Sequence, residues 1–321
     1  MGTLTGNSHI MERDVGSGGG SLEPHGGTEG PSIESISRSV LPKPDDRLRL
    51  GKSGKAVSPV CLGRVSSEET VLRAYEAGIN FFFLSADLHW PVYEQLRRGL
   101  GRLFAGNSAR RDEIVVAAAS YVDEPLFGCL QLNEILDAVP GLKRVDVLIA
   151  GAVSNGGSFK RIETLEQARR MKRFDSVAVG ATFHERRYAL TAARFNVLDI
   201  AYIRYNTGHP NARKDLFPHL PAERKFLVFN FNSMLSCVGE KTFHAMGLRK
   251  ELWRPDPVDY YRFVLSNSNI DGLLCSPQNA DELRHMCSAL HQPPLTAAEQ
   301  DYMITLSARA RYYAKGAAAG D

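Results

Sequence analysis

What this sequence lacks narrows the range of functions. It contains no apolar run of the roughly 18 to 20 residues that a membrane span needs, and no apolar segment preceded by positive charge near its start. Its five cysteines are widely spaced, odd in number and free of any C-x-x-C pair, which argues against a disulfide framework and a structural zinc site. We therefore expect a cytoplasmic protein that contains reduced thiols, binds no metal and has no membrane partner.

The sequence also lacks a cluster of charged residues of one sign. The chain has 39 basic and 36 acidic residues, a net charge of +3, and its Lys and Arg residues are scattered along the sequence. Proteins that bind polyanions gather basic residues into patches or stripes. We therefore predict no nucleic-acid partner, and a small molecule is the expected substrate.

The first 36 residues differ in composition from the rest. They include GSGGGS and EPHGGTEGPS, which are too poor in apolar side chains to offset the entropy of chain ordering. We predict a disordered Gly/Ser-rich tail over residues 1–36 and a single domain over residues 47–313. With 43% hydrophobic residues, the chain has enough apolar material for one barrel of about 250 residues.

Short apolar runs alternate with segments of helical period from Arg47 onward, the pattern of βα units with a parallel sheet. Eight runs have the length and continuous apolar character of buried parallel strands. They are Ser58–Gly63, Asn80–Ala86, Glu113–Ser120, Val145–Ala152, Ser176–Phe183, Leu198–Tyr205, Phe226–Ser233 and Gly272–Ser276. Eight strands predict an α/β fold of the (β/α)8 or TIM barrel type.

The segments between the strands carry helix signals. SEETVLRAYEAG offers Ser66 or Ser67 as a cap and Gly78 as a terminator, and Pro91 in PVYEQLRRGLGRLF suits a first helical turn. A doubly wound open sheet would give the same alternation. However, no G-x-G-x-x-G follows the first strand, so the phosphate loop of a dinucleotide-binding fold is missing. The closed barrel is the better interpretation.

Five stretches in order resemble a known family. They are LGKSGKAVSPVCLG, AYEAGINFF, LEQARRMKRFDSVAVGATF, AYIRYN and LSNSNIDGLLCSPQNADEL. Together they resemble the aldo-keto reductases between about Arg47 and Leu290. The resemblance implies a (β/α)8 barrel, a nicotinamide cofactor that lies across the C-terminal mouth, and carbonyl reduction by hydride transfer.

The catalytic residues that the family implies are missing here. Its members use a Tyr to protonate the carbonyl, a Lys to lower the pKa of that Tyr, an Asp to pair with the Lys and a His to orient the carbonyl. The matching positions are Phe83 for the Asp, Leu88 for the Tyr, Ser120 for the Lys and Gly151 for the His. Joint loss of the Asp and the Lys is self-consistent, because a lone member of a buried ion pair costs roughly 3 to 5 kcal/mol.

The cofactor contacts that the resemblance implies are also altered. The amide-binding Ser, Asn and Gln correspond to Ala181, Thr182 and Tyr202, and the Arg that holds the 2′-phosphate corresponds to Gln278. The remaining candidates are Phe231 for ring stacking, Ser276 in the phosphate turn, and the helix N-terminus at Asn279, which would attract a phosphate. No Arg or Lys stands near these positions in the sequence, so we predict weak NADPH binding at most.

Other polar residues at the strand ends are candidates for acid–base chemistry. A His with a nearby carboxylate suits proton transfer near pH 7, so we predict His89 as the base, Asp87 as its partner, and Tyr93 or Tyr202 as a hydrogen-bond donor. Three functions remain open. They are a non-redox enzyme that performs dehydration, isomerisation or cyclisation, an NAD(P)H-dependent reductase of carbonyls or imines with displaced catalytic residues, and a catalytically silent binding or regulatory barrel.

Overall fold

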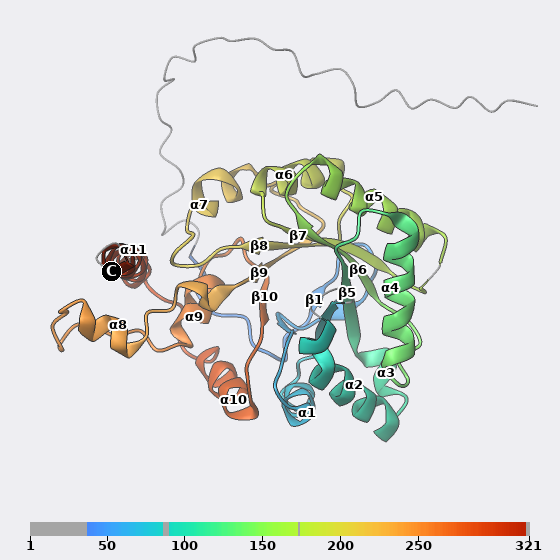
Figure 1. Cartoon of the computed structure of the whole chain (residues 1–321), viewed down its shortest axis with the longest axis horizontal. Coiled ribbons are helices and arrows are strands. Elements are labelled where there is room, and N and C mark those ends of the chain that lie inside the picture. Colours follow the sequence, from blue (N-terminus) through green and yellow to red (C-terminus); the bar gives the residue numbers. More distant parts are fainter. Residues whose placement is uncertain (1–36, 86–89, 173, 319–321) are drawn as a thin grey trace, which may run out of the picture. The chain divides into compact units, whose positions relative to one another are not determined.

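The computed structural model describes residues 37–85, 90–172 and 174–318 (Figure 1). The predicted tail over residues 1–36 lies outside this part of the chain. Eight parallel strands form a closed barrel in the order β10-β3-β4-β5-β6-β7-β8-β9. Seven strands fall within the runs that the sequence predicts, and β6 extends one residue beyond its predicted run, to Val153, so the (β/α)8 barrel is confirmed. The strands are β3 Val60–Leu62, β4 Phe81–Ser85, β5 Val115–Ser120, β6 Val147–Val153, β7 Ala178–Phe183, β8 Ile200–Arg204, β9 Leu227–Phe231 and β10 Gly272–Cys275.

Helices α1, α2, α4, α5 and α6 lie outside the ring of strands (Figure 1). The helices are α1 Glu68–Glu76, α2 Glu94–Gly106, α3 Arg110–Glu113, α4 Pro125–Ala138, α5 Gly156–Arg170, α6 Arg186–Phe195, α7 Ala212–Asp215, α8 Glu240–Ala245, α9 Asp259–Leu265, α10 Ala280–Ala289 and α11 Ala297–Ala318. Short 3-10 turns cover η2 Trp90–Tyr93, η3 Phe217–His219 and η4 Ser233–Ser236. No helix of the described residues has the length and apolar character needed to span a membrane.

The signals at the ends of α1 are confirmed. The Ser67 hydroxyl accepts a hydrogen bond from the amide of Thr70 and caps the helix. After the helix, Gly78 has a φ of +91°, and a Cβ there would lie 2.6 Å from the Cβ of Asp45. Only glycine adopts this conformation in so little space. The turn aims the chain directly into β4.

A two-stranded hairpin closes the N-terminal end of the barrel. Strands β1 Leu48–Arg49 and β2 Ala56–Val57 pair antiparallel. Leu50 and Val57 are fully buried against the barrel interior, in one cluster with Phe81 and Val115, the first residues of β4 and β5. Apolar burial of this kind contributes about 25 cal/mol per Å². The hairpin therefore covers the N-terminal end of the barrel interior with apolar side chains.

Aromatic rings fill the centre of the barrel. Tyr202 makes edge-to-face contacts with Phe83 at 5.5 Å and with Phe229 at 5.8 Å between ring centroids. Small residues give these rings their space. A Cβ on Gly272 would lie 2.5 Å from the Phe229 ring, and a Cβ on Gly180 would lie 2.5 Å from Ile200 Cγ2. The interior is thus a packed core and not a channel.

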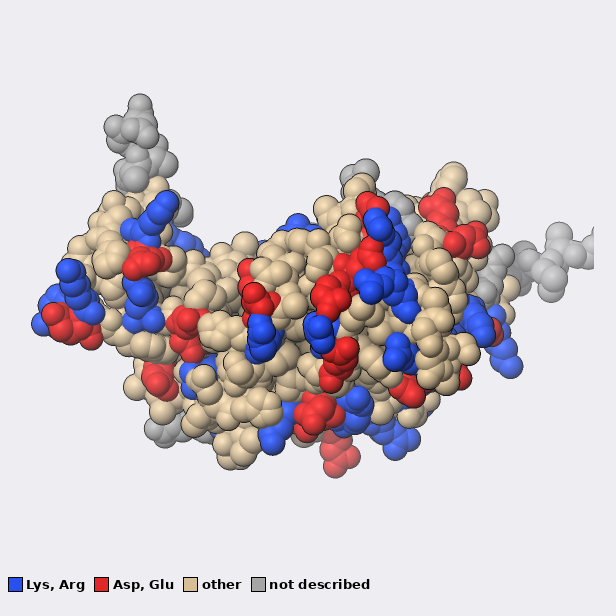
Figure 2. Space-filling model, turned by 90° about the horizontal axis from the view of Figure 1, so that it is seen from below, with Lys and Arg blue, Asp and Glu red and all other residues tan. Residues whose placement is uncertain are grey.

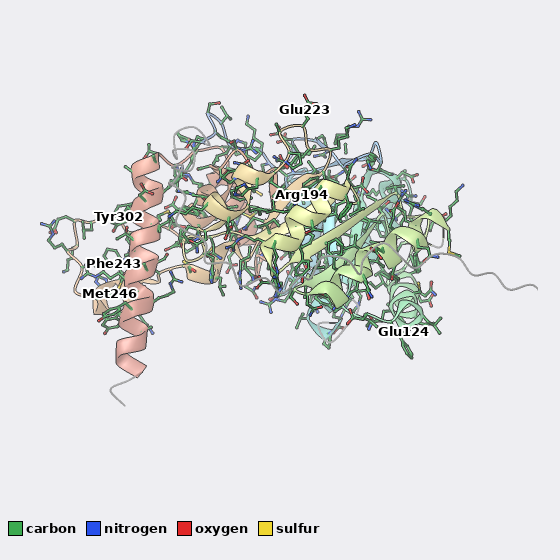
Figure 3. The ribbon with its side chains drawn as sticks, turned by 90° about the horizontal axis from the view of Figure 1, so that it is seen from above. Glu124, Arg194, Glu223, Phe243, Met246 and Tyr302 are labelled. Atoms are coloured by element: carbon green, nitrogen blue, oxygen red, sulfur yellow. The ribbon has the colours of Figure 1, made fainter. Side chains whose placement is uncertain are left out.

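A smaller apolar cluster lies to one side of the barrel. Helices α8 and α11 pack together there, away from the strands, with Phe243 and Met246 of the α8 segment and Tyr302 of α11 on facing sides (Figure 3). Leu306 of α11 is buried in the same cluster. This contact holds α11 in place, and α11 carries Arg311, which lines a hollow beside the barrel mouth.

The burial of Phe83 predicts the effect of two substitutions. Phe83 is 2% exposed and surrounded by apolar side chains. We expect Phe83→Asp to lower the free energy of unfolding by at least about 3 kcal/mol, because it removes a ring and buries a carboxylate without a cation. Phe83→Leu should cost only about 1 kcal/mol. Denaturant unfolding measures both. Equal midpoints for Phe83→Asp and the wild type would mean that Phe83 does not point into the barrel.

Candidate functional site at the barrel mouth

A cleft of about 490 Å³ opens at the C-terminal ends of the strands. This is the end at which barrel enzymes place their chemistry. Five aromatic side chains line it, namely Phe83, Tyr93, Tyr121, Phe231 and Tyr261. Ser276 and Gln278 line the side beside β10. Sequence reasoning missed Arg64, which also lines the cleft and forms no hydrogen bond or ion pair with another described residue. The sequence feature that could have identified Arg64 is its position just after the C-terminal end of β3, next to Gly63.

The structure shows what fills the positions where the resemblance expects catalytic residues. Phe83 lies inside the barrel below the mouth. Ser120 ends β5, is 2% exposed, and has its hydroxyl 3.4 Å from Oε1 of Gln131. At Gly151 of β6, a Cβ would lie 2.6 Å from the ring of Tyr121. The Tyr121 ring therefore occupies the space that a side chain at position 151 would need. Leu88 lies outside the described residues.

The predicted catalytic residues divide into three cases. His89 and Asp87 lie outside the described residues, so both stay predictions. Tyr93 ends η2 and lines the cleft. Tyr202 is fully buried in the barrel, with its hydroxyl 3.7 Å from Sγ of Cys61, and burial raises its pKa well above the usual value. This position makes Tyr202 a core residue and not a donor to the cleft.

The predicted cofactor residues have partners of their own. The Phe231 ring stacks on His184 with centroids 5.8 Å apart. Asn279 caps α10 by accepting a hydrogen bond from the amide of Glu282 at 2.9 Å, and the Glu282 carboxylate accepts one from the amide of Gln278 at 2.8 Å. An acidic side chain thus already covers this helix N-terminus. Ser276 is exposed on the cleft wall.

Other residues at the barrel mouth also form hydrogen bonds with the backbone or with each other. The Thr182 hydroxyl accepts a hydrogen bond from the amide of Ala152 at 2.7 Å. The side-chain carbonyl of Gln278 accepts one from the Ser66 hydroxyl at 2.8 Å. No cluster of His, Cys, Asp and Glu that could hold a metal ion occurs among the described residues.

His184 is the described histidine that faces the cleft. It follows β7 directly and lines both the cleft and a neighbouring basic pocket. Partial burial, and then the positive charge of Arg204, lower its pKa below the ordinary 6.5, and Glu185 opposes this shift. A neutral imidazole at pH 7 is a proton acceptor. The arrangement therefore supplies a base at the mouth.

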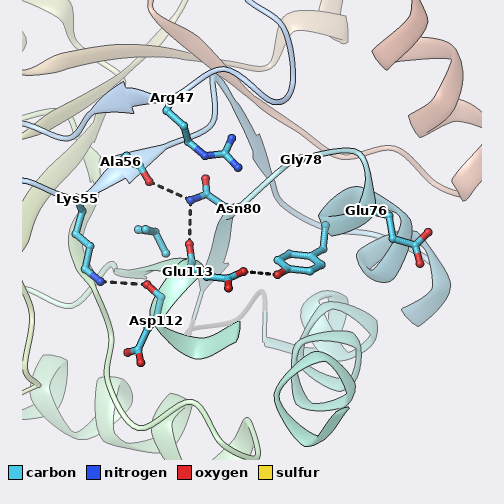
Figure 4. Close-up of a pocket in the computed structure, with 10 residues that line it drawn as sticks. Arg47, Lys55, Ala56, Glu76, Gly78, Asn80, Asp112 and Glu113 are labelled. Carbon is cyan, nitrogen blue, oxygen red and sulfur yellow. Dashed lines mark hydrogen bonds between the residues drawn. The ribbon is translucent and has the colours of Figure 1, made fainter. Parts of the chain in front are cut away.

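The opposite end of the barrel has a different character. A hollow of about 680 Å³ there is lined by polar side chains that already have partners (Figure 4). Asn80 donates to the carbonyls of Ala56 and Glu113 at 3.0 and 2.9 Å. Nearby, the buried Arg111 and Asp146 form an ion pair at 2.7 Å. The hollow is larger than the mouth cleft, but its groups hold the fold together and leave little free for a ligand.

Basic and acidic side chains are interspersed on the outer helices. On the face formed by α10, α1 and α2, blue and red atoms alternate without a large area of one sign (Figure 2). Glu68 of α1 pairs with Arg98 at 2.7 Å and with Arg102 at 3.3 Å, which links α1 to α2. Exposed pairs of this kind contribute about 0 to 1 kcal/mol each.

Comparison with known proteins gives the fold and no closer relationship. No protein-family model matches the chain, and no curated protein sequence matches it. Several solved structures resemble it. A Bacillus halodurans aldo-keto reductase in its holo form is 13% identical with a TM-score of 0.63, and the match covers 82% of this chain and 96% of that one. A Bombyx mori aldo-keto reductase in complex with NADP is 16% identical with a TM-score of 0.61 over 81% and 92% of the two chains.

A third structure, from Pseudomonas aeruginosa and assigned to the aldo-keto reductases, is 18% identical with a TM-score of 0.59 over 80% and 98% of the two chains. The chain therefore has the fold of the aldo-keto reductases. At these identities the likeness defines the barrel, and function has to be argued from the site.

The contact between Tyr121 and Gly151 can be tested by a double-mutant cycle. Gly151→Ala places a methyl group against the ring and should lower the free energy of unfolding by about 1 to 3 kcal/mol. In a Tyr121→Ala background the same change should cost less, by at least about 0.5 kcal/mol. Gly156→Ala is the control, since nothing lies within 4 Å of its Cβ position. Strictly additive losses would show that the ring does not cover Gly151.

Proposed function

We propose that this protein is an enzyme of aldo-keto reductase fold that acts on a small molecule at the barrel mouth by acid–base chemistry without hydride transfer. Dehydration, isomerisation and cyclisation are reactions of this class. The observation that carries the proposal is the packing at the mouth. Phe83 and the Tyr121–Gly151 contact fill two of the positions that the sequence resemblance assigns to reductase residues, and His184 faces the open cleft.

The tyrosines of the described site do not suit carbonyl protonation. A reductase needs a phenol whose pKa is lowered by a buried cation. Burial instead raises the pKa of both Tyr202 and Tyr261. Among the described residues that line the cleft there is no lysine. A neutral histidine is the better proton acceptor at this mouth, and Tyr93 is a candidate donor across the cleft.

The described residues do not fit a nicotinamide dinucleotide well. His184 already stacks on Phe231, the ring that would carry the nicotinamide. Glu282 covers the helix N-terminus at Asn279, where a phosphate would have to lie. The proposed reaction therefore uses no nicotinamide cofactor. His184 accepts a proton, with His89 and Asp87 retained as a second predicted acid–base pair.

One observation favours a second function. Arg64 places an unpaired cation in the cleft, near the β10 side that holds Ser276, and a guanidinium there could bind a phosphate of NADPH. A reductase with displaced catalytic residues is therefore the competing proposal. The silent-barrel alternative gains no support, since the mouth contains a cleft of about 490 Å³ and is not filled by side chains.

Calorimetric titration with NADPH, NADP and NADH separates these proposals. We expect no binding at about 1 mM cofactor, because within the cleft itself Arg64 is the one described cation that could hold a phosphate. We also expect no NADPH oxidation with a panel of aldehydes, ketones and cyclic imines. Micromolar binding, weakened by Arg64→Gln, would contradict the proposed function and favour the reductase.

The pKa of His184 provides a test that needs no substrate. Titration of ring-labelled histidines by NMR, assigned with His184→Gln, should give a pKa below 6.5 for His184. Arg204→Met should raise the pKa of His184, since it removes a positive charge that lowers this pKa. Arg194→Gln, at an exposed position in the last turn of α6, should leave the pKa of His184 unchanged. An activity that depends on neutral His184 then declines as the pH falls below about 6.5. A wild-type pKa above 6.5 would argue against His184 as the base.

A further inference from the structure

A second hollow of about 640 Å³ adjoins the mouth cleft, and His184 lines both. It lies between the loop from β7 to α6 and the loop from β8 to α7, with Arg311 of α11 on its rim. This hollow, called the basic pocket below, contains four arginines and two histidines against two acids. The four arginines are Arg186, Arg187, Arg204 and Arg311, and the acids are Glu185 and Asp215.

The charge of the basic pocket is not balanced by the protein. Arg186 and Asp215 pair with each other, with Nε and Oδ1 2.7 Å apart. The remaining three arginines face one acid, Glu185, so the pocket carries an excess of two positive charges with its histidines neutral (3 − 1 = 2). A phosphate monoester carries about −1.5 to −2 at pH 7, which matches this excess, whereas a carboxylate would balance half of it.

Arg204 is the feature that points to a ligand. It ends β8, its Nε is buried, and that atom has no hydrogen-bond partner among the described residues. The rest of its guanidinium forms no hydrogen bond or ion pair with another described residue either. Arg204 as a whole is partly exposed, so a ligand can reach it. A buried guanidinium nitrogen without an acceptor is costly, and a bidentate oxyanion is the acceptor whose geometry fits the guanidinium group.

The surrounding groups are oriented for the same ligand. His209 is held by Asn206, with Nδ1 and Oδ1 3.1 Å apart, so its ring has a fixed place in the pocket wall. Helix α6 begins at the pocket, and its first turn has no side-chain cap from Glu185. The positive end of its helix dipole adds attraction for an anion.

We infer that the basic pocket binds the phosphate group of a phosphate monoester, with the rest of the molecule in the mouth cleft. This inference rests on the proposed function, because it names the substrate class of the same mouth. The phosphate would lie against Arg204 and the start of α6, and an attached ring would reach His184 and Phe231, which stack on each other at the boundary between the two hollows. The phosphate anchors the substrate and takes no part in the bond changes.

The test uses phenyl phosphate as the probe, with benzoate as the carboxylate comparison, in calorimetric titrations at constant ionic strength. We expect phenyl phosphate to bind the full-length protein and benzoate to bind at least about fivefold more weakly. Arg204→Met should weaken phenyl phosphate binding about tenfold to hundredfold. Arg311→Gln should weaken it less, because Arg311 is exposed on the rim.

Two controls keep the result interpretable. Arg194→Gln removes one positive charge from the last turn of α6, outside the pocket, and should leave the binding unchanged (Figure 3). Arg204→Met should fold with an undiminished midpoint of thermal unfolding, since it removes a buried Nε that has no hydrogen-bond partner among the described residues. Failure of phenyl phosphate to bind at about 10 mM would overturn the inference. Equal binding by Arg204→Met, or benzoate binding as tight as that of phenyl phosphate, would do so as well.

The cofactor titrations distinguish a failure here from a failure of the proposed function. Binding of phenyl phosphate with no binding of NADPH or NADH supports both proposals. A different outcome is binding of NADPH but not of NADH, with the NADPH binding lost in Arg204→Met. It would support a pocket for phosphate monoesters, but it would contradict the proposed function, because the bound phosphate would be the one that distinguishes NADPH from NADH. Absence of all three interactions would overturn the pocket and leave the proposed function standing.

Discussion

The volume inside the barrel is the constraint on which the rest of the structure depends. Four large rings, Phe81, Phe83, Tyr202 and Phe229, share an interior that eight short strands enclose. They fit only because glycine stands at positions such as 180 and 272, where a methyl group would collide with a neighbour. This packing makes the centre of the barrel dry, and it moves any chemistry outward to the layer of side chains at the strand ends. The same packing keeps Tyr202 out of the cleft.

The two ends of the barrel differ in how the buried nitrogens of their arginines are hydrogen-bonded. At the N-terminal end the Arg111 guanidinium donates to Asp146 and to three backbone carbonyls, so its cost of desolvation is offset within the protein. At the C-terminal end the buried Nε of Arg204 has no such partner. A saturated arginine fits a structural role and an unsatisfied one fits a binding role, because only the second still has hydrogen bonds to give.

The sequence predicts the barrel well because its signal is repeated. All eight strand regions could be found, since each is a continuous apolar run between helical segments, and the cap at Ser67 and the stop at Gly78 follow from local chemistry. The strand boundaries were less certain, as with Glu113–Ser120, where the strand begins at Val115. Backbone pairing across the barrel sets these limits, and periodicity does not contain that information.

The site could be predicted only in outline. His184 follows β7 and Arg204 ends β8, so the strand assignment alone is enough to place both at the mouth. The exclusion of Tyr202 from the cleft and the approach of Tyr121 to Gly151 arise instead from side-chain packing. Arg64 was missed because it follows β3, far in sequence from the β10 residues beside which it lies. Closure of the barrel brings the first and last of its strands together, and such a contact has no local signature.

The contact between Tyr121 and Gly151 also limits how this barrel could change over evolutionary time. A histidine at position 151 requires a β-carbon where the tyrosine ring now lies, so that single substitution passes through a clashing and less stable protein. Removing the ring first leaves an unfilled space at the cleft wall. The two positions can therefore change easily only together, and a series of single mutations would seldom place a side chain at position 151.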